Sequence, residues 1–398
     1  MSSEALAPIV IVGGGAAGFA CAEAFRKAGG TDPLIIMSAD DRAPYFRPDL
    51  SKELLAGDKP AADRLADDDW FADNDVDLRL HSRASRLDAE AHTISAGTGA
   101  DKRTVQWSRC VLATGSSAAR LPVPGGDDAR LLTIRSAADV ERIIAQVDGT
   151  GPVAVVGSGF IGCEAASSLR ARGIDVTMVS LEIQPQQDRL SEFVGAMIAG
   201  WLADAGIDFR GSRSVEGIEF TDDGAAVLLA NGERVEAAHI LVASGALTNT
   251  ELAASAGLRV TNGGIHVDSS MRSTADGVFV VGDLAFADNV AAGRPLRVEH
   301  WDDAQSMGVI AGKVMAGEGA EWDGLPGFWS TITGETLQYV AWGDGWDEVT
   351  ARRSDSGISV WYGKNGTIVG LLTHRHDDDQ ERGKKLILSG APFPPKQP

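Results

Sequence analysis

The chain has 398 residues, 44% of them hydrophobic, and this length and composition predict a folded protein of two or three domains. Its 56 acidic and 36 basic residues give a formal net charge of −20, which repels phosphate backbones and argues against nucleic-acid binding as a primary role. The three cysteines lie far apart without metal-type spacing, so no metal site or disulfide scaffold is expected, and a reducing, cytoplasmic location is favoured.

The first predicted unit is a strand, a glycine-rich turn and a helix near the N-terminus. The apolar run Ile9–Ala22 is too short for a membrane span and is predicted to be a buried strand leading into a helix. The turn carries Gly13, Gly15 and Gly18 in the spacing GxGxxG, and a second apolar strand follows at 33–38. Such glycines turn the chain tightly and admit a pyrophosphate against bare backbone, so this unit predicts a dinucleotide site.

A second unit of the same kind is predicted at Val153–Ser180. Its turn carries Gly157, Gly159 and Gly162, again between an apolar strand and a helix. Two such turns in one chain predict two bound dinucleotides.

Two similar segments flank the second unit, "CVLATGSS" at 110–117 and "ILVASGAL" at 240–247. Each runs from an apolar strand into a turn of small residues. We interpret them as the two crossings between a first domain and a second domain inserted into it. The segment "GVFVVGDLA" at 277–285 then adds one more buried strand to the first domain.

The pattern changes beyond residue 322, where segments alternate as antiparallel strands do and Asn365-Gly366 is a typical hairpin turn. The predicted fold class is therefore α/β, with two Rossmann-like dinucleotide-binding domains, one inserted in the other, and a C-terminal α+β domain with an antiparallel sheet. The predicted limits are 1–117 with 245–321 for the first domain, 118–244 for the second and 322–398 for the third.

Six motifs carry a resemblance to a known family. In chain order they are "PYFRPDLSKELL", "LATGS", "GSGFIGCEAA", "GVFVVGDLA", "RVEHWDDAQSMG" and "FWS". Together they resemble FAD-dependent pyridine-nucleotide oxidoreductases of the ferredoxin reductase kind, which include putidaredoxin and rubredoxin reductases and are related to apoptosis-inducing factor. The resemblance implies a flavoprotein that passes a hydride from NAD(P)H to FAD and then single electrons to a ferredoxin or rubredoxin, serving an oxygenase such as a cytochrome P450.

The resemblance also implies which residues contact the cofactors. The first glycine turn would hold the FAD pyrophosphate and the second would hold NADH or NADPH. The other cofactor contacts that it implies are Asp40, Arg47, Lys52, Thr114, Gly115, Arg135, Phe160, Ile161, Glu164, Ser180, Gly245, Asp283, Glu299, His300, Trp301 and Trp329.

Lys52 and Glu164 are the catalytic pair that the resemblance implies, with Trp301 at the flavin edge. The glutamate would orient the lysine beside the hydride-accepting atom and touch the nicotinamide side. The helix expected after Trp301 would favour the negative charge of the reduced flavin through its dipole. Cys163, beside Glu164, is predicted to be a small buried helix residue without redox chemistry.

Two departures from the family pattern concern the riboses of the dinucleotides. Ala39 stands where an acidic ribose ligand is usual, which leaves Asp40 as a shifted substitute. Ser180 stands where an acid commonly selects NADH, with Glu182 two residues on and Arg189 as a candidate phosphate partner. NADH is therefore only mildly favoured, and NADPH stays an alternative.

The electron acceptor also stays open. A docking face for an acidic ferredoxin should be basic, and Arg294 with Arg297, or Lys52 with Lys59, are candidates for it. Two other functions fit the same motifs: a redox-sensing interaction protein in the manner of apoptosis-inducing factor, and an NAD(P)H oxidase or quinone reductase.

Overall fold

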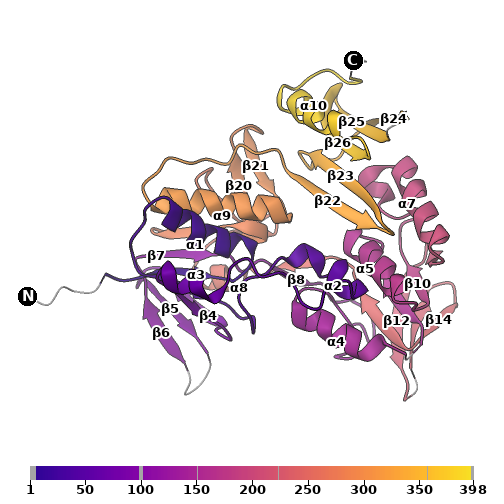
Figure 1. Cartoon of the computed structure of the whole chain (residues 1–398), viewed down its shortest axis with the longest axis horizontal. Helices are drawn as coiled ribbons and strands as arrows, with labels where there is room; N and C mark the ends of the chain where they lie inside the picture. Colours follow the sequence, from indigo (N-terminus) through magenta and orange to yellow (C-terminus); the bar gives the residue numbers. More distant parts are fainter. Residues whose placement is uncertain (1–5, 98–101, 150, 223, 356, 396–398) are drawn as a thin grey trace, which may run out of the picture.

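The computed structural model describes residues 6–97, 102–149, 151–222, 224–355 and 357–395. Figure 1 shows three groups of sheets and helices, with the C-terminal group, in yellow, lying above the magenta one.

The first group is built on a five-stranded parallel sheet of order β19-β7-β1-β2-β3. Most of its strands are apolar and fully buried, as expected of a parallel sheet covered on both faces. Its strands are β1 (Ile9–Val12), β2 (Leu34–Met37), β3 (Val76–Arg79), β7 (Arg109–Leu112) and β19 (Val278–Val280).

Helices α1 (Ala16–Lys27) and α9 (Trp301–Met315) lie side by side over this sheet (Figure 1). Glycines of α9 permit the close approach, because a Cβ added to Gly308 would lie 2.2 Å from the Ala17 carbonyl oxygen. A Cβ added to Gly312 would lie 2.4 Å from that of Cys21. The smaller elements around the sheet are α3 (Asp68–Asp73), α8 (Glu251–Ser255), β4 (Ala84–Asp88), β5 (Thr93–Ala96), β6 (Arg103–Gln106), β17 (Val260–Thr261), β18 (Gly264–Val267), β20 (Ala285–Asn289) and β21 (Arg294–Arg297). Helix α2 (Glu53–Ala56) packs instead on helices of the second group.

The second group repeats this plan with a four-stranded parallel sheet of order β11-β10-β9-β15. An antiparallel sheet of order β12-β13-β14 packs beside it. The elements of this group are α4 (Ala137–Val147), β9 (Val153–Val156), α5 (Phe160–Ala171), β10 (Val176–Val179), α6 (Gln187–Leu190), α7 (Glu192–Asp204), β11 (Asp208–Arg210), β12 (Val215–Phe220), β13 (Ala225–Leu229), β14 (Arg234–Ala237) and β15 (His239–Val242).

The two segments interpreted as chain crossings pair with each other. Strand β8 (Ser116–Ala118) is antiparallel to β16 (Ala246–Thr248), with Ser116 opposite Thr248. The domain limits given above stay a prediction.

The third group is a five-stranded antiparallel sheet of order β22-β23-β26-β25-β24, with α10 (Asp377–Leu388) packed against it. Its strands are β22 (Gly327–Ile332), β23 (Glu335–Ala341), β24 (Glu348–Arg353), β25 (Ile358–Lys364) and β26 (Thr367–His374). The predicted hairpin turn is present between β25 and β26, where Asn365 and Gly366 have φ values of 51° and 73°. The predicted fold class is confirmed.

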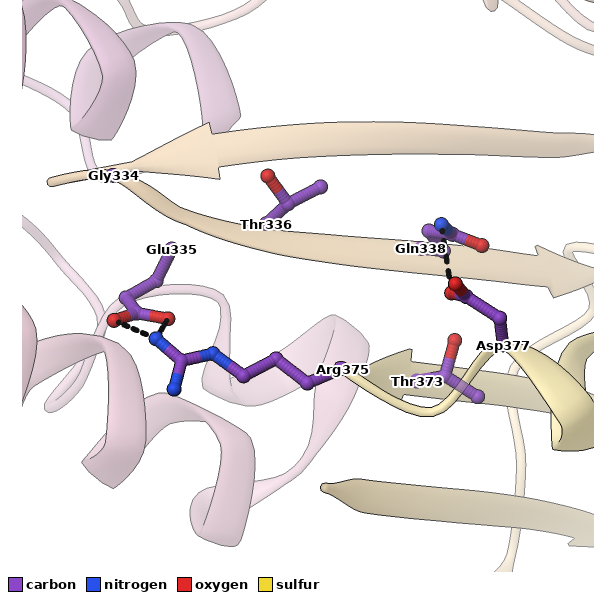
Figure 2. A pocket seen from close by; sticks show the side chains of 7 residues that line it. All are labelled: Gly334, Glu335, Thr336, Gln338, Thr373, Arg375 and Asp377. Atoms are coloured by element: carbon purple, nitrogen blue, oxygen red, sulfur yellow. Dashed lines mark hydrogen bonds and ion pairs between the residues drawn. The ribbon is translucent and has the colours of Figure 1, made fainter. Parts of the chain in front are cut away.

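A polar pocket of about 210 Å³ lies on this third sheet (Figure 2). Two of the charged side chains that line it form an ion pair with each other. Arg375 donates to both carboxylate oxygens of Glu335, at 2.7 and 2.8 Å. Gln338 similarly donates to Asp377 at 3.4 Å. The pocket is therefore lined by side chains that are paired with one another.

The three cysteines are fully buried, and burial raises the pKa of each thiol, that of Cys110 to about 12. The prediction that Cys163 is a core residue is therefore confirmed. Among the described residues no helix is long and apolar enough to cross a membrane, and no cluster of candidate metal ligands is found.

Candidate active site

The first glycine turn follows β1 and has no room for a side chain at two of its three glycines. Gly13 has φ of +124°, and a Cβ there would lie 2.0 Å from the carbonyl oxygen of Ala113. A Cβ on Gly18 would lie 2.0 Å from the Gly13 carbonyl oxygen, whereas Gly15, the N-cap of α1, faces open space. The backbone at Gly15 and the N-terminus of α1 are thus free to receive an anionic group such as a pyrophosphate.

The second glycine turn follows β9 and repeats this geometry. A Cβ on Gly157, whose φ is +110°, would lie 2.4 Å from the carbonyl oxygen of Ala243. A Cβ on Gly162 would lie 2.2 Å from the Gly157 carbonyl oxygen, and Gly159 caps α5. Both turns therefore form a cradle that a Cβ would fill, as a dinucleotide site requires.

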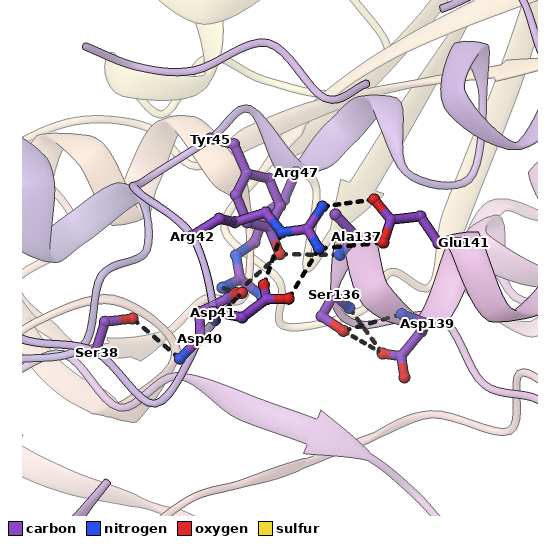
Figure 3. A network of polar contacts seen from close by, with 10 residues as sticks. All are labelled: Ser38, Asp40, Asp41, Arg42, Tyr45, Arg47, Ser136, Ala137, Asp139 and Glu141. Atoms are coloured by element: carbon purple, nitrogen blue, oxygen red, sulfur yellow. Dashed lines mark hydrogen bonds and ion pairs between the residues drawn. The ribbon is translucent and has the colours of Figure 1, made fainter. Parts of the chain in front are cut away.

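A polar network joins the loop after β2 to the start of α4 (Figure 3). The hydroxyl of Tyr45 donates to Asp40 at 2.9 Å and accepts from the backbone N–H of Ala137 at 3.0 Å. Arg47 donates to Asp40 at 3.2 Å and to the carbonyl of Arg135 at 2.7 Å. Burial raises the pKa of Tyr45 to about 12, so it stays a neutral donor.

Arg42 lies next to this network, between the carboxylates of Asp41 and Glu141 (Figure 3). The side-chain hydrogen bonds to these two acids raise the pKa of Arg42 and keep it charged. The loop after β2 is thus fastened to α4 by two separate sets of contacts.

Several predicted cofactor residues meet beyond the carboxyl ends of β7 and β19. Asp283 accepts from Arg135 at 2.9 Å and from the hydroxyl of Ser116 at 2.6 Å. Gly115 has φ of +60°, and a Cβ there would lie 3.2 Å from the Arg135 guanidinium. Thr114 instead donates to the carbonyl of Asn249 at 2.9 Å, so its side chain binds the returning chain.

Lys52 and Glu164, the predicted catalytic pair, are brought together although they lie on different elements. The lysine Nζ is 3.3 Å from Oε2 of the glutamate, whose side chain is 3% exposed. Two hydroxyls also donate to this carboxylate, that of Ser51 to Oε2 at 2.5 Å and that of Ser330 to Oε1 at 2.7 Å. One cation and two hydroxyls thus hold this buried carboxylate in a fixed orientation.

Strand β22 packs one face against α5 and turns the other toward an aromatic group. Phe328 and Ser330 face α5, because the Phe328 ring is 4.5 Å from the Phe160 ring and Ser330 binds Glu164. Trp329, between them in sequence, lies on the opposite face and stacks on Phe46 at 6.4 Å. This alternation is the period of two of a β-strand.

Phe46 links the two predicted tryptophans, since its ring also meets Trp301 edge-on at 5.1 Å. Trp301 begins α9, and its neighbour His300 contacts Asp303 at 3.3 Å. Burial and the charge of Asp303 raise the pKa of Asp302 in this first turn. Trp301, Phe46 and Trp329 form an aromatic trio.

The remaining predicted contacts are more dispersed. Glu299 forms an ion pair with Arg297, and Ile161 is 46% exposed in the first turn of α5. Gly245 has φ of +120° with open space around it. Ser180 is 5% exposed, so its side chain is enclosed at the end of β10.

The candidate docking cations are all paired with carboxylates. Lys59 contacts Asp49 at 2.5 Å and Asp63 at 2.6 Å, so two carboxylates hold this lysine. Lys52 pairs with Glu164, Arg297 with Glu299, and Arg294 with Asp344. The field of each of these cations is therefore partly cancelled by its acidic partner.

Four residues that were not predicted from the sequence take part in these contacts: Tyr45, Phe46, Ser51 and Ser330. All four lie inside motifs that carry the resemblance. The alternation of Phe328, Trp329 and Ser330 was the available signal that the serine and the tryptophan face opposite sides.

The chain is similar to known proteins over nearly its whole length. The family described as pyridine nucleotide-disulphide oxidoreductase matches residues 7–308. The chain is 32% identical to the ferredoxin–NAD(+) reductase component of the anthranilate 1,2-dioxygenase system of Burkholderia cepacia, over 98% of this chain and 96% of that protein.

Two solved structures share the fold. The ferredoxin reductase for the CYP199A2 system of Rhodopseudomonas palustris has a TM-score of 0.90 at 27% identity, over 97% of this chain and 95% of that one. The covalent putidaredoxin reductase–putidaredoxin complex also gives a TM-score of 0.90, at 26% identity, over 98% of this chain and 94% of that one.

Proposed function

The chain belongs to the pyridine nucleotide-disulphide oxidoreductase family, and we propose that it is an FAD-containing reductase that oxidises NADH and reduces a ferredoxin-type protein. One NADH would reduce two one-electron acceptors and release one proton. The relatives named above, which serve dioxygenase and related systems, support an oxygenase as the final consumer. The three unpaired cysteines support a cytoplasmic location.

The residues present fit the two dinucleotides. The first glycine turn, with Asp283, Arg135 and Arg47 around it, supplies bare backbone, a helix N-terminus and hydrogen-bonding groups for FAD. The second turn supplies the same cradle for the nicotinamide nucleotide. We assign 1–117 with 245–321 to the FAD-binding domain, 118–244 to the NADH-binding domain and 322–398 to the interface domain.

The contact of Lys52 with Glu164 is the main support for this proposal. Lys52 lies just before α2, and Glu164 lies on α5, the helix that starts at the second glycine turn. Bound FAD would supply the hydride acceptor and the store from which single electrons leave. Lys52 has ammonium hydrogens beyond the one that Glu164 accepts, so it can donate toward that acceptor. Glu164 fixes the lysine, and Ser51 and Ser330 fix Glu164.

The aromatic trio supports the second half of the reaction. Trp329 and Trp301 reach Phe46 from different elements and are only partly buried. They would exclude water from one side of the FAD site while leaving a short path to a docked acceptor.

Anaerobic stopped-flow absorption tests the proposal. The purified protein should be yellow, NADH should bleach the flavin band quickly, and the reduced protein should then reduce a ferredoxin. A colourless protein that cannot be reconstituted with FAD would overturn the assignment. Slow bleaching with a lasting charge-transfer band would favour a redox-sensing protein, and turnover with oxygen or quinones alone would favour an oxidase or quinone reductase.

A further inference from the structure

The buried hydroxyl of Ser168 forms its hydrogen bonds outside its own helix. Ser168 lies on α5 and is 6% exposed. A serine inside a helix can satisfy its hydroxyl on the carbonyl four residues back, as the neighbouring Ser167 does on Cys163 at 2.7 Å. Ser168 donates instead to the main-chain carbonyl of Ser51 at 2.7 Å and lies 3.2 Å from that of Lys52. Its single proton is therefore shared between two consecutive carbonyls of a distant segment.

The same face of α5 also holds the side chains of this segment. Glu164 precedes Ser168 by four residues, a spacing that places both on one face of the helix. The Glu164 carboxylate accepts from the Ser51 hydroxyl at 2.5 Å and from the Lys52 ammonium at 3.3 Å. Helix α5 thus contacts each of the two residues twice, once at the side chain and once at the main-chain carbonyl.

A lysine needs both kinds of contact if its ammonium is to be held in one place. The stem of Lys52 has four methylene groups, so a contact at the ammonium alone leaves the stem free to change its conformation. Lys52 is the N-cap of α2, and a helix of four residues is too short to fix its own first residue. The bond from Ser168 restrains the main chain at the base of the stem, while Glu164 holds its charged end.

Helix α5 also carries part of the nucleotide cradle. It begins at the second glycine turn, where Gly159 is its N-cap. Glu164 and Ser168 lie further along the same helix, so one rigid element relates the position of Lys52 to that of the second turn.

We propose that Ser168 is a positioning residue for flavin reduction, which fixes the main chain of Lys52 and thereby the place of its ammonium at the FAD site. The cation favours the negative charge that a bound flavin gains on reduction, and this effect weakens as the separation grows. The inference rests on the proposed function and adds to it a residue that touches neither dinucleotide turn.

Stopped-flow absorption and potentiometry of the holoprotein test this role. Ser168→Ala should lower the maximal rate of flavin reduction by NADH about tenfold, because a small displacement of a reacting or stabilising group has effects of this order. The Kd for NADH should change little. The midpoint potential of the flavin should become more negative by about 30 mV, the equivalent of a tenfold change for a two-electron couple. A purely structural role would lower thermal stability and leave this potential unchanged.

Two further variants separate the hydroxyl from general packing. Ser168→Thr keeps the hydroxyl and should restore both the rate and the potential. Ser270→Ala is the matched control, because the Ser270 hydroxyl also donates to a main-chain carbonyl, that of Ala320 at 2.8 Å. It should leave the rate and the potential unchanged.

Amide hydrogen exchange of the apoprotein gives a readout that is independent of turnover. Residues 51–56 should exchange faster in Ser168→Ala than in the unsubstituted protein, because their main chain loses its bond to α5. Unchanged exchange there, an unchanged rate and potential, or an equal loss in Ser168→Thr would overturn the positioning role. An unsubstituted protein that NADH does not reduce would overturn the proposed function instead.

Discussion

The two glycine turns have the same backbone plan but differ in how the acid after the second strand is held. After β2, Asp40 accepts from Arg47 and Tyr45 and so joins its loop to α4. After β10, Glu182 accepts only from neutral groups and keeps an exposed oxygen. The first site is fastened as suits a cofactor that stays, and the second is open as suits a nucleotide that comes and goes.

The largest expected effect is the loss of folding free energy when alanine replaces a glycine of the first turn. Gly13→Ala forces a Cβ to within 2.0 Å of the Ala113 carbonyl oxygen at φ of +124°, and should cost about 3 kcal/mol of folding free energy or more. Gly15→Ala is the control, because its Cβ meets open space. Gly15→Ala should leave the apoprotein's unfolding midpoint unchanged and weaken only the binding of FAD. Denaturation of the apoprotein measures the first effect, and titration with FAD measures the second. Equal stability of the two apoproteins would contradict this account.

The next largest effect is expected at the point where the two sites meet. Lys52→Ala removes the cation that Glu164 holds and should slow flavin reduction by NADH about 100-fold, with FAD content retained. Stopped-flow absorption measures it, and Lys27→Ala, exposed on α1, serves as the control. An unchanged reduction rate would remove Lys52 from the catalytic assignment.

A smaller effect is expected from Ser330, which we predict to be a positioning residue. Ser330→Ala deletes one of the two hydroxyls on Glu164 and should lower the maximal rate of flavin reduction about tenfold. The Kd for NADH should change little, because the serine lies on the third sheet and not on the second turn. A change confined to Kd, or to thermal stability, would show that Ser330 does not act through Glu164.

Sequence patterns were sufficient for features that depend on local spacing. The glycines at 13, 15 and 18 and at 157, 159 and 162 specify a turn whatever surrounds them. The pairing of Lys52 with Glu164 came from the family resemblance, and the contact is present. The fold class followed from the alternation of strand and helix signals.

Features set by side-chain direction or by distant packing could not be predicted. Ser330 reaches Glu164 only because β22 packs on α5, 166 residues away in sequence. Arg294, a candidate for the basic docking face, pairs with Asp344, 50 residues later in the chain. A count of basic residues therefore overestimated the positive charge of that face. Likewise, Ser180 directly follows β10, but its hydroxyl contacts the hydroxyl of Ser158.

The smallest effect is expected from the network that fastens the first site. Tyr45→Phe leaves the N–H of Ala137 without its acceptor and should cost about 1–3 kcal/mol of unfolding free energy. Tyr339→Phe is the control, since its hydroxyl forms no hydrogen bond within the described residues. Because Asp40 also loses a donor, Tyr45→Phe should release FAD more readily on dilution, while its binding of NAD⁺ stays unchanged. An equal loss at both sites would mean that the network stabilises the whole molecule and does not distinguish the fixed cofactor from the exchanging one.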